Sequence, residues 1–89
     1  MDISYDIESI SSLVNGKIVG PASLNHIRVL LIDSRRVVEP STALFIAIVG
    51  GQNDGHKYVG QLVQRGFKSF LVSRELDLPN DCCQIIVKD

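Results

Sequence analysis

The fold is decided by residues 43–72, which read ALFIAIVGGQNDGHKYVGQLVQRGFKSFLV. This stretch opens with the apolar run 43–49 and closes with residues 67–72, which alternate between apolar and polar as a strand does. Between the two runs, residues 56–65 carry apolar side chains at helical spacing, and Gly66 is well placed to end that helix. A strand–helix–strand unit of this kind predicts a right-handed crossover that joins two parallel strands.

Shorter elements are expected on either side of this unit. Residues 6–15 read as an amphipathic helix with Asp6 as its N-cap. Short strands are expected at 17–19 and 84–87, and the nearly continuous apolar run 26–32 suits a strand that is covered on both faces. Together these elements predict an α/β domain with a small mixed, mostly parallel sheet flanked by two helices.

Length and composition indicate one globular domain. The 89 residues suffice for one compact domain and not for two, so residues 1–89 are interpreted as a single domain that ends just after a strand. A net charge of −1 and an aromatic content of 6% disfavour a nucleic-acid-binding surface. No apolar stretch approaches the roughly 20 residues that cross a bilayer, and the acidic N-terminus lacks the positive region of a signal peptide. We therefore expect a cytoplasmic protein with neither a membrane nor a nucleic acid as partner.

Two polar segments follow the two central apolar runs. The first is Ile32-Asp33-Ser34-Arg35, and the second is residues 50–56, GGQNDGH. Because ligands of open α/β sheets bind beyond the carboxyl ends of the strands, both segments would face one cleft if the two strands are parallel neighbours. Paired glycines let the backbone approach a flat base, and amide, hydroxyl and guanidinium groups suit a pyrimidine edge and a phosphate. The side chains that would make such contacts are Ser34, Arg35, Gln52 and Asn53.

Each segment alone also has a plainer interpretation. A Gly-Gly pair followed by Asn-Asp-Gly is more often a turn than a binding site, and Asp54 is expected to cap the following helix. His56 is expected to pack or cap at that helix start, and Cys82 and Cys83 to be reduced thiols. No catalytic set, metal-binding set or Gly-x-x-x-x-Gly-Lys-Ser/Thr phosphate loop can be assembled, so no catalytic residue, metal ligand or ATP cradle is assigned.

Taken in order, the two segments resemble the N-terminal domain of the Mur ligases. The residues that carry the resemblance are Asp33-Ser34-Arg35, Leu44-Phe45-Ile46-Ala47, Gly50, Asp54-Gly55-His56-Lys57-Tyr58, Gly66-Phe67 and Phe70-Leu71-Val72. The resemblance extends from Ile7 to Val87. Within the family it is strongest to the ligases that add D-alanyl-D-alanine to UDP-N-acetylmuramoyl-tripeptide, including the form fused to an alanine racemase. The sequence departs from the family at Pro40-Ser41-Thr42-Ala43, where Pro-Gly-Asp is usual, and the exact uracil contacts depend on this connector.

The resemblance implies a division of labour along a longer chain. This domain would bind the UDP part of UDP-N-acetylmuramoyl-peptide, a central domain would bind ATP and Mg²⁺, and a fused racemase would carry pyridoxal phosphate. By matching positions, Ile32 and Ser34 would contact the uridine diphosphate with Arg35 beside them, and Gly51, Gln52 and Asn53 would surround the uracil and ribose. Without an ATP cradle, the 89 residues are not expected to ligate alone. The alternatives are the corresponding domain of the diaminopimelate- or lysine-adding Mur ligase, and a non-catalytic α/β interaction module.

Overall fold

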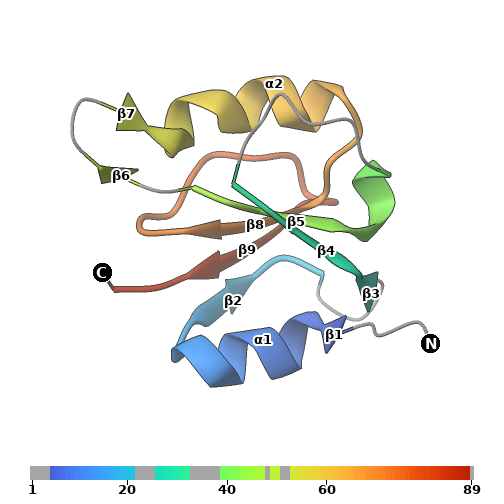
Figure 1. Cartoon of the computed structure of the whole chain (residues 1–89), viewed down its shortest axis with the longest axis vertical. Coiled ribbons are helices and arrows are strands. Elements are labelled where there is room, and N and C mark those ends of the chain that lie inside the picture. The colour runs from blue at the N-terminus through green and yellow to red at the C-terminus, as the bar shows by residue number, and fades with distance from the viewer. Residues whose placement is uncertain (1–4, 22–25, 33–38, 48, 51–52, 89) are drawn as a thin grey trace.

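The main feature of the fold is a five-stranded mixed sheet (Figure 1). The protein is represented by a computed structural model, which describes residues 5–21, 26–32, 39–47, 49–50 and 53–88. Four strands of the sheet run parallel to one another, and the outer strand β2 runs antiparallel to β9. The predicted mixed, mostly parallel α/β sheet is therefore confirmed. In order across the sheet the strands are β2 (Lys17–Val19), β9 (Cys83–Ile86), β8 (Ser69–Val72), β5 (Ala43–Ile46) and β4 (Val29–Leu31).

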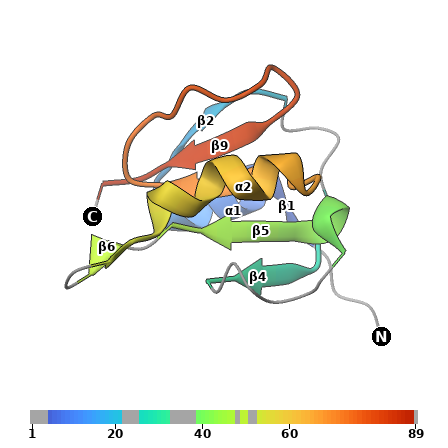
Figure 2. The same ribbon diagram turned by 90° about the horizontal axis from the view of Figure 1, so that it is seen from above.

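Two helices cover opposite faces of this sheet, as Figures 1 and 2 show. Helix α1 (Ile7–Val14) precedes β2, and helix α2 (Val59–Gln64) lies in the crossover between β5 and β8. Both predicted helices are present. The remaining short elements are β1 (Tyr5–Asp6) paired with β3 (His26–Ile27), the 3-10 turns η1 (Pro40–Thr42) and η2 (Gly55–Tyr58), and β6 (Val49–Gly50) paired with β7 (Asn53–Asp54).

A single capping residue defines each end of α1. The side chain of Asp6 accepts a hydrogen bond from the backbone N–H of Ser9 at 2.7 Å, so it is the N-cap that the sequence predicts. Asn15 adopts the left-handed conformation with φ 54° and ends the helix. Ile7 and Ile10 face the sheet and are buried. A helix of only eight residues is marginal in isolation, so this apolar contact with the sheet is its main support.

The core consists of one apolar layer on each face of the sheet. The layer under α2 is the larger and contains three fully buried aromatic side chains, Phe45, Phe67 and Phe70. Val59 and Leu62 of α2 pack into this layer. Burying an apolar side chain of this size stabilises the fold by roughly 1.5–3 kcal/mol. The layer under α1 contains Ile7, Ile10, Ile27, Leu44, Cys83 and Ile85.

The predicted helix at 56–65 starts differently from expectation. Residues 55–58 form the 3-10 turn η2, and the α-helix begins only at Val59. The tighter first turn arises where Asp54 caps the chain and the His56 ring is held by other residues. The helix ends as predicted, because Gly66 has φ 99°, which favours glycine, and β8 follows.

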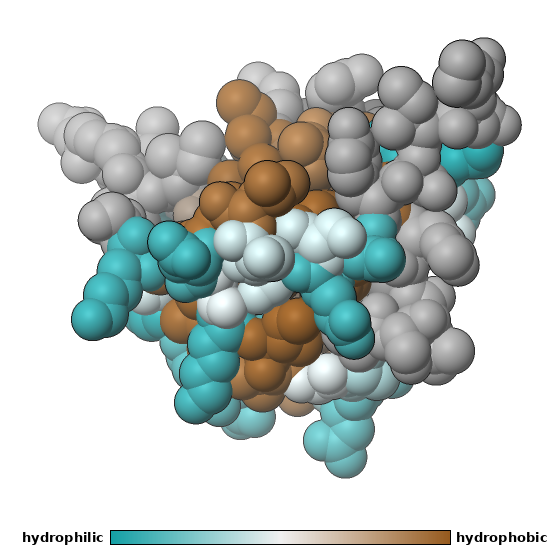
Figure 3. All heavy atoms as spheres, turned by 90° about the horizontal axis from the view of Figure 1, so that it is seen from below, coloured by the Kyte–Doolittle hydropathy of each residue, from teal (hydrophilic) through white to brown (hydrophobic). Residues whose placement is uncertain are grey.

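The prediction of one strand, covered on both faces, over residues 26–32 is wrong. The run divides at Arg28 into β3 and β4, and the Arg28 N–H donates instead to the carbonyl of Thr42 at 2.8 Å. β4 is the edge strand opposite β2 in the sheet. Leu30 is therefore 58% exposed and Ile32, which follows β4, is 65% exposed, whereas Leu31 is buried under the α2 face. Figure 3 views the molecule from the α1 side and shows apolar residues gathered near the centre of this face, with hydrophilic residues around them.

Candidate functional site

Three strands end together at the carboxyl edge of the parallel part of the sheet. β4 and β5 are adjacent and parallel, with Leu31 opposite Phe45, and β5 and β8 are adjacent and parallel, with Ile46 opposite Leu71. This arrangement fulfils the condition on which the sequence-based cleft depended. The chain that follows β4, the hairpin β6–β7 that follows β5, and the chain that follows β8 all start from this one edge.

The predicted ligand residues are only partly within the described chain. Ile32 follows β4 directly and exposes 65% of its surface at this edge. Asn53 begins strand β7, where its backbone pairs with Gly50. The sequence indicated a turn-rich segment here, whereas Asn53 and Asp54 pair with Gly50 and Val49 as a short strand. The other predicted contacts, Ser34, Arg35, Gly51 and Gln52, lie outside the described residues.

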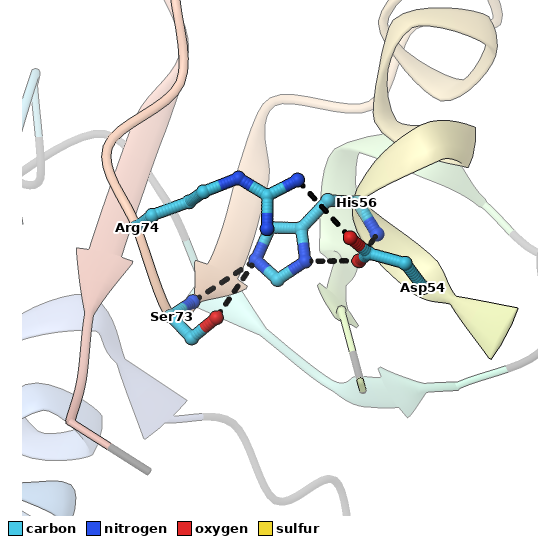
Figure 4. A network of polar contacts seen from close by, with 4 residues as sticks. All are labelled: Asp54, His56, Ser73 and Arg74. Carbon is cyan, nitrogen blue, oxygen red and sulfur yellow. Dashed lines mark hydrogen bonds and ion pairs between the residues drawn. The ribbon is translucent and has the colours of Figure 1, made fainter. Parts of the chain in front are cut away.

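A network of four polar side chains lies beside the hairpin (Figure 4). One oxygen of Asp54, Oδ1, accepts hydrogen bonds from the His56 backbone N–H at 2.9 Å and from His56 Nδ1 at 2.6 Å. The other oxygen, Oδ2, accepts from Nη2 of Arg74 at 3.1 Å. On the far side of the ring, His56 Nε2 accepts from the backbone N–H of Ser73 at 3.0 Å. The network thus connects the end of β7 to the chain that follows β8.

These contacts fix the hydrogen positions in the network. A backbone N–H can only donate, so Nε2 of His56 must present its lone pair to Ser73. The hydrogen of the neutral ring is then on Nδ1 and is donated to Asp54. Hydrogen bonds from the backbone and ring of His56, together with the Arg74 guanidinium, lower the pKa of Asp54 from its ordinary 3.8 to about 2. The network therefore holds the Asp54 carboxylate between the ring N–H of His56 and the Arg74 guanidinium.

Two predictions for this region are confirmed. Asp54 is the N-cap of the turn that starts the second helix, and the His56 side chain is packed, with 1% of its surface exposed. Sequence reasoning did not assign roles to Ser73 and Arg74. The available signal was their position directly after the run 67–72, since that strand ends at the same sheet edge as the other two polar segments.

A depression of about 480 Å³ lies near β2 and the loop before β9. Gln84, one of the polar residues that line it, is already engaged, because its amide accepts from the Leu76 N–H at 2.8 Å and donates to the Leu76 carbonyl at 2.7 Å. Within the described ranges, no three His, Cys, Asp or Glu residues are grouped so that they could hold a metal ion. Among the helices of the described chain, none is long and apolar enough to span a bilayer.

Comparison with known sequences points to one kind of enzyme. No protein-family model matches the chain. Two curated relatives are UDP-N-acetylmuramoyl-L-alanyl-D-glutamate–2,6-diaminopimelate ligases, from Clostridioides difficile (strain 630) and from Lactiplantibacillus plantarum (strain ATCC BAA-793 / NCIMB 8826 / WCFS1). The first is 39% identical over 57 residues and the second 39% identical over 72 residues. The matches cover 64% and 76% of this chain, but only 11% and 14% of the relatives.

Comparison with solved structures also finds Mur ligases, and the matches cover nearly the whole chain. A crystal structure of MurF from Acinetobacter baumannii has a TM-score of 0.84 at 25% identity, and covers 98% of this chain and 18% of that one. The UDP-N-acetylmuramoylalanyl-D-glutamyl-2,6-diaminopimelate–D-alanyl-D-alanyl ligase of the same organism has a TM-score of 0.85 at 25% identity, covering 98% of this chain and 19% of that one. The chain is homologous to the Mur ligases.

The resemblance that the sequence carries is thus confirmed at the level of the Mur ligases. The curated relatives are diaminopimelate ligases and the structural neighbours are D-alanyl-D-alanyl ligases, so the two comparisons point to different Mur ligases. The chain spans less than a fifth of the length of each of these Mur ligases.

Proposed function

We propose that this chain is the UDP-binding N-terminal domain of a Mur ligase of peptidoglycan synthesis. In the longer cytoplasmic enzyme it would hold the UDP part of UDP-N-acetylmuramoyl-tripeptide while D-alanyl-D-alanine is added. A central domain of the same longer chain would bind ATP and Mg²⁺. That central domain would also be the partner against which the UDP-binding domain packs. Pyridoxal phosphate would enter only with a fused alanine racemase. The domain itself would bind and orient the substrate without contributing a catalytic residue.

The shared carboxyl edge of β4 and β5 carries this proposal. It brings Ile32 and the β6–β7 hairpin to one side of the sheet, which is where ligands of open α/β sheets bind. Ile32 is 65% exposed at this edge, although an isoleucine gains most by leaving water. A ribose or base that covers it would remove that apolar surface from solvent. Ser34, Arg35, Gly51 and Gln52 continue the same two segments in sequence and would supply the polar contacts.

The test is an NMR titration of the ¹⁵N-labelled chain with UDP. We expect shifts concentrated at Ser34 and at residues 51–53, with weak affinity because partner domains would complete the cleft. UDP-N-acetylmuramoyl-tripeptide should shift the same amides. Shifts scattered over the surface, or no shifts at millimolar UDP, would contradict the proposal.

A pair of variants sharpens the titration. Ile32→Ala should weaken UDP binding by about three- to tenfold, since the loss of contact area corresponds to roughly 1 kcal/mol. Leu13→Ala is the matched control, because Leu13 is an exposed apolar residue, 79% accessible, on α1. It should leave the affinity unchanged. Equal effects of the two substitutions on the affinity for UDP would show that Ile32 does not contact the ligand.

The second candidate is the diaminopimelate-adding ligase, which the 39% identity to two such enzymes favours. Both ligases would use the same UDP site, so the isolated chain cannot distinguish them. The encoded sequence beyond Asp89 should contain a Gly-x-x-x-x-Gly-Lys-Thr loop, and its absence would favour a non-catalytic module. The longer enzyme can then be incubated with the substrates of the diaminopimelate-adding reaction and, separately, with those of the D-alanyl-D-alanine-adding reaction. Mass spectrometry of the products would show which reaction it catalyses.

A further inference from the structure

We propose that His56 is a positioning residue, which holds the β6–β7 hairpin against the end of β8 so that the hairpin is in place before the nucleotide binds. The part of this inference that concerns the nucleotide rests on the proposed function. The part that concerns the hairpin rests on the contacts of His56 alone.

The hairpin has little support of its own. Each strand has two residues, and the pairs are Val49 with Asp54 and Gly50 with Asn53. These strands form a separate two-stranded sheet and do not join the main five-stranded sheet. A two-stranded hairpin of this size is marginal in water, so its orientation depends on what holds its ends.

His56 supplies the link at the C-terminal end of the hairpin. Its ring is buried, and its two nitrogens face different elements: Nδ1 contacts Asp54 of β7, and Nε2 accepts from the Ser73 N–H beyond β8. Arg74 adds an outer contact to the same Asp54 carboxylate, with its side chain 55% exposed. Asp54 is therefore tied to the chain after β8 twice, once through the interior and once at the surface.

The polar nature of this link favours positioning over stability. A well-packed apolar side chain often stabilises a buried site as well as a hydrogen-bonded network does. Hydrogen bonds instead impose direction, because donor and acceptor must align. Asn53, a predicted nucleotide contact, directly precedes Asp54, so any displacement of Asp54 shifts the backbone of Asn53.

Three variants separate the two halves of the link. His56→Asn places its amide near the position of Nδ1, so it retains a donor to Asp54 but does not reach Ser73. His56→Gln places its amide near the position of Nε2, so it retains an acceptor for Ser73. His56→Leu removes both polar contacts while filling the site. Ile10→Val is the control, because Ile10 lies in the other core layer under α1 and its truncation lowers stability without touching the network.

The readouts are amide hydrogen exchange and UDP affinity, each compared with the melting temperature. For His56→Leu we expect exchange at Gly50 and Asn53, the backbone-paired residues of the hairpin, to rise at least tenfold relative to Phe70 in β8, and the Kd for UDP to rise at least tenfold. In His56→Gln the exchange ratio and the Kd for UDP should both lie within about threefold of the wild type. In His56→Asn both quantities should lie between those of His56→Gln and His56→Leu. Ile10→Val should lower the melting temperature and leave the exchange ratio and the Kd unchanged.

The outcomes distinguish this inference from the proposed function. If His56→Leu changes only the melting temperature, as the control does, the residue is structural and the inference is overturned. If the wild type binds UDP and His56→Leu binds it equally well, the inference fails and the proposed function stands. If the hairpin amides exchange faster in His56→Leu but the wild type binds no UDP, the hairpin role is supported and the proposed function is overturned.

Discussion

Nε2 of His56 accepts a hydrogen bond from the backbone N–H of Ser73 at 3.0 Å, between residues that are 17 positions apart in the chain. The contact joins the start of the crossover helix to the chain that leaves the next strand, so the β5–α2–β8 unit is closed by a buried polar link as well as by its apolar layer. The Ser73 hydroxyl oxygen also lies 3.3 Å from Nε2, but the donor in the 3.0 Å bond is a backbone N–H, which substitution of the Ser73 side chain leaves in place. The link therefore depends on position 56.

Asp54 should make the stability of the domain depend on pH in the acid range. Its pKa is lowered from 3.8 to about 2 by His56 and Arg74, so this carboxylate stabilises the fold above its unfolded pKa and loses that effect as the pH falls through about 2. Between about pH 5 and about pH 2, the melting temperature of the wild type should fall more than that of Asp54→Asn. Circular dichroism melts at several pH values measure the difference. Parallel curves for the two proteins would contradict the assignment, since all other carboxyls titrate in both.

The same substitution should have opposite effects at two glycines. Gly20 has φ 104°, and a Cβ there would overlap the carbonyl oxygen of Cys82, so Gly20→Ala should destabilise the domain by at least about 2 kcal/mol. At Gly60, inside α2, a Cβ would meet open space, so Gly60→Ala should stabilise by about 0.5–1 kcal/mol. Urea unfolding of both variants gives the two values. A destabilised Gly60→Ala would mean that α2 packs differently from the structure.

Gln84 should be required for the loop that precedes β9. Gln84→Leu would leave the N–H and carbonyl of Leu76 without their present partner, which corresponds to a loss of about 1–3 kcal/mol. Gln84→Glu keeps an acceptor for the Leu76 N–H but sets a carboxylate against the Leu76 carbonyl, so it should not restore stability. Urea unfolding and amide exchange at Leu76 report the two effects. Full stability in Gln84→Leu would show that water replaces the amide.

Cys82 and Cys83 should react slowly in the folded protein. Burial raises the pKa of both thiols, that of Cys83 to about 11, and the thiolate is the reactive form. Iodoacetamide at about pH 8 should therefore label neither cysteine within the time that labels both in urea. Mass spectrometry counts the added groups. Rapid labelling of the folded chain would indicate that β9 opens locally.

Most of the sheet could be predicted because the residue pattern of its strands differs from that of the segments between them. The apolar runs at 43–49 and 67–72, separated by a helical pattern, specify a parallel crossover before any contact is known. The error at 26–32 has a physical origin. A continuous apolar run indicates burial on both faces only for a strand inside the sheet, and position in the sheet is a tertiary property that local pattern does not contain.

The candidate site was predictable only in part for a similar reason. The roles of Ile32 and Asn53 were inferred from the resemblance to the Mur ligases and from two polar segments that follow apolar runs, and they stay predictions. The contact between His56 and Ser73 could not be predicted, because it joins residues on either side of the whole crossover helix. A histidine at a helix start is compatible with capping, packing or catalysis, and only the fold supplies the partners of its two nitrogens.

The place of β9 in the sheet has a consequence for how the chain acquires its structure during synthesis. Residues 17–19 find their sheet partners at 84–86, and α1 packs on Cys83 and Ile85 of the same strand. A nascent chain that has emerged only as far as β8 therefore has no strand to pair with β2, and it lacks Cys83 and Ile85, a third of the layer under α1. The N-terminal helix can complete its packing only after residues 83–86 leave the ribosome, so the last step in the folding of this domain comes late in synthesis.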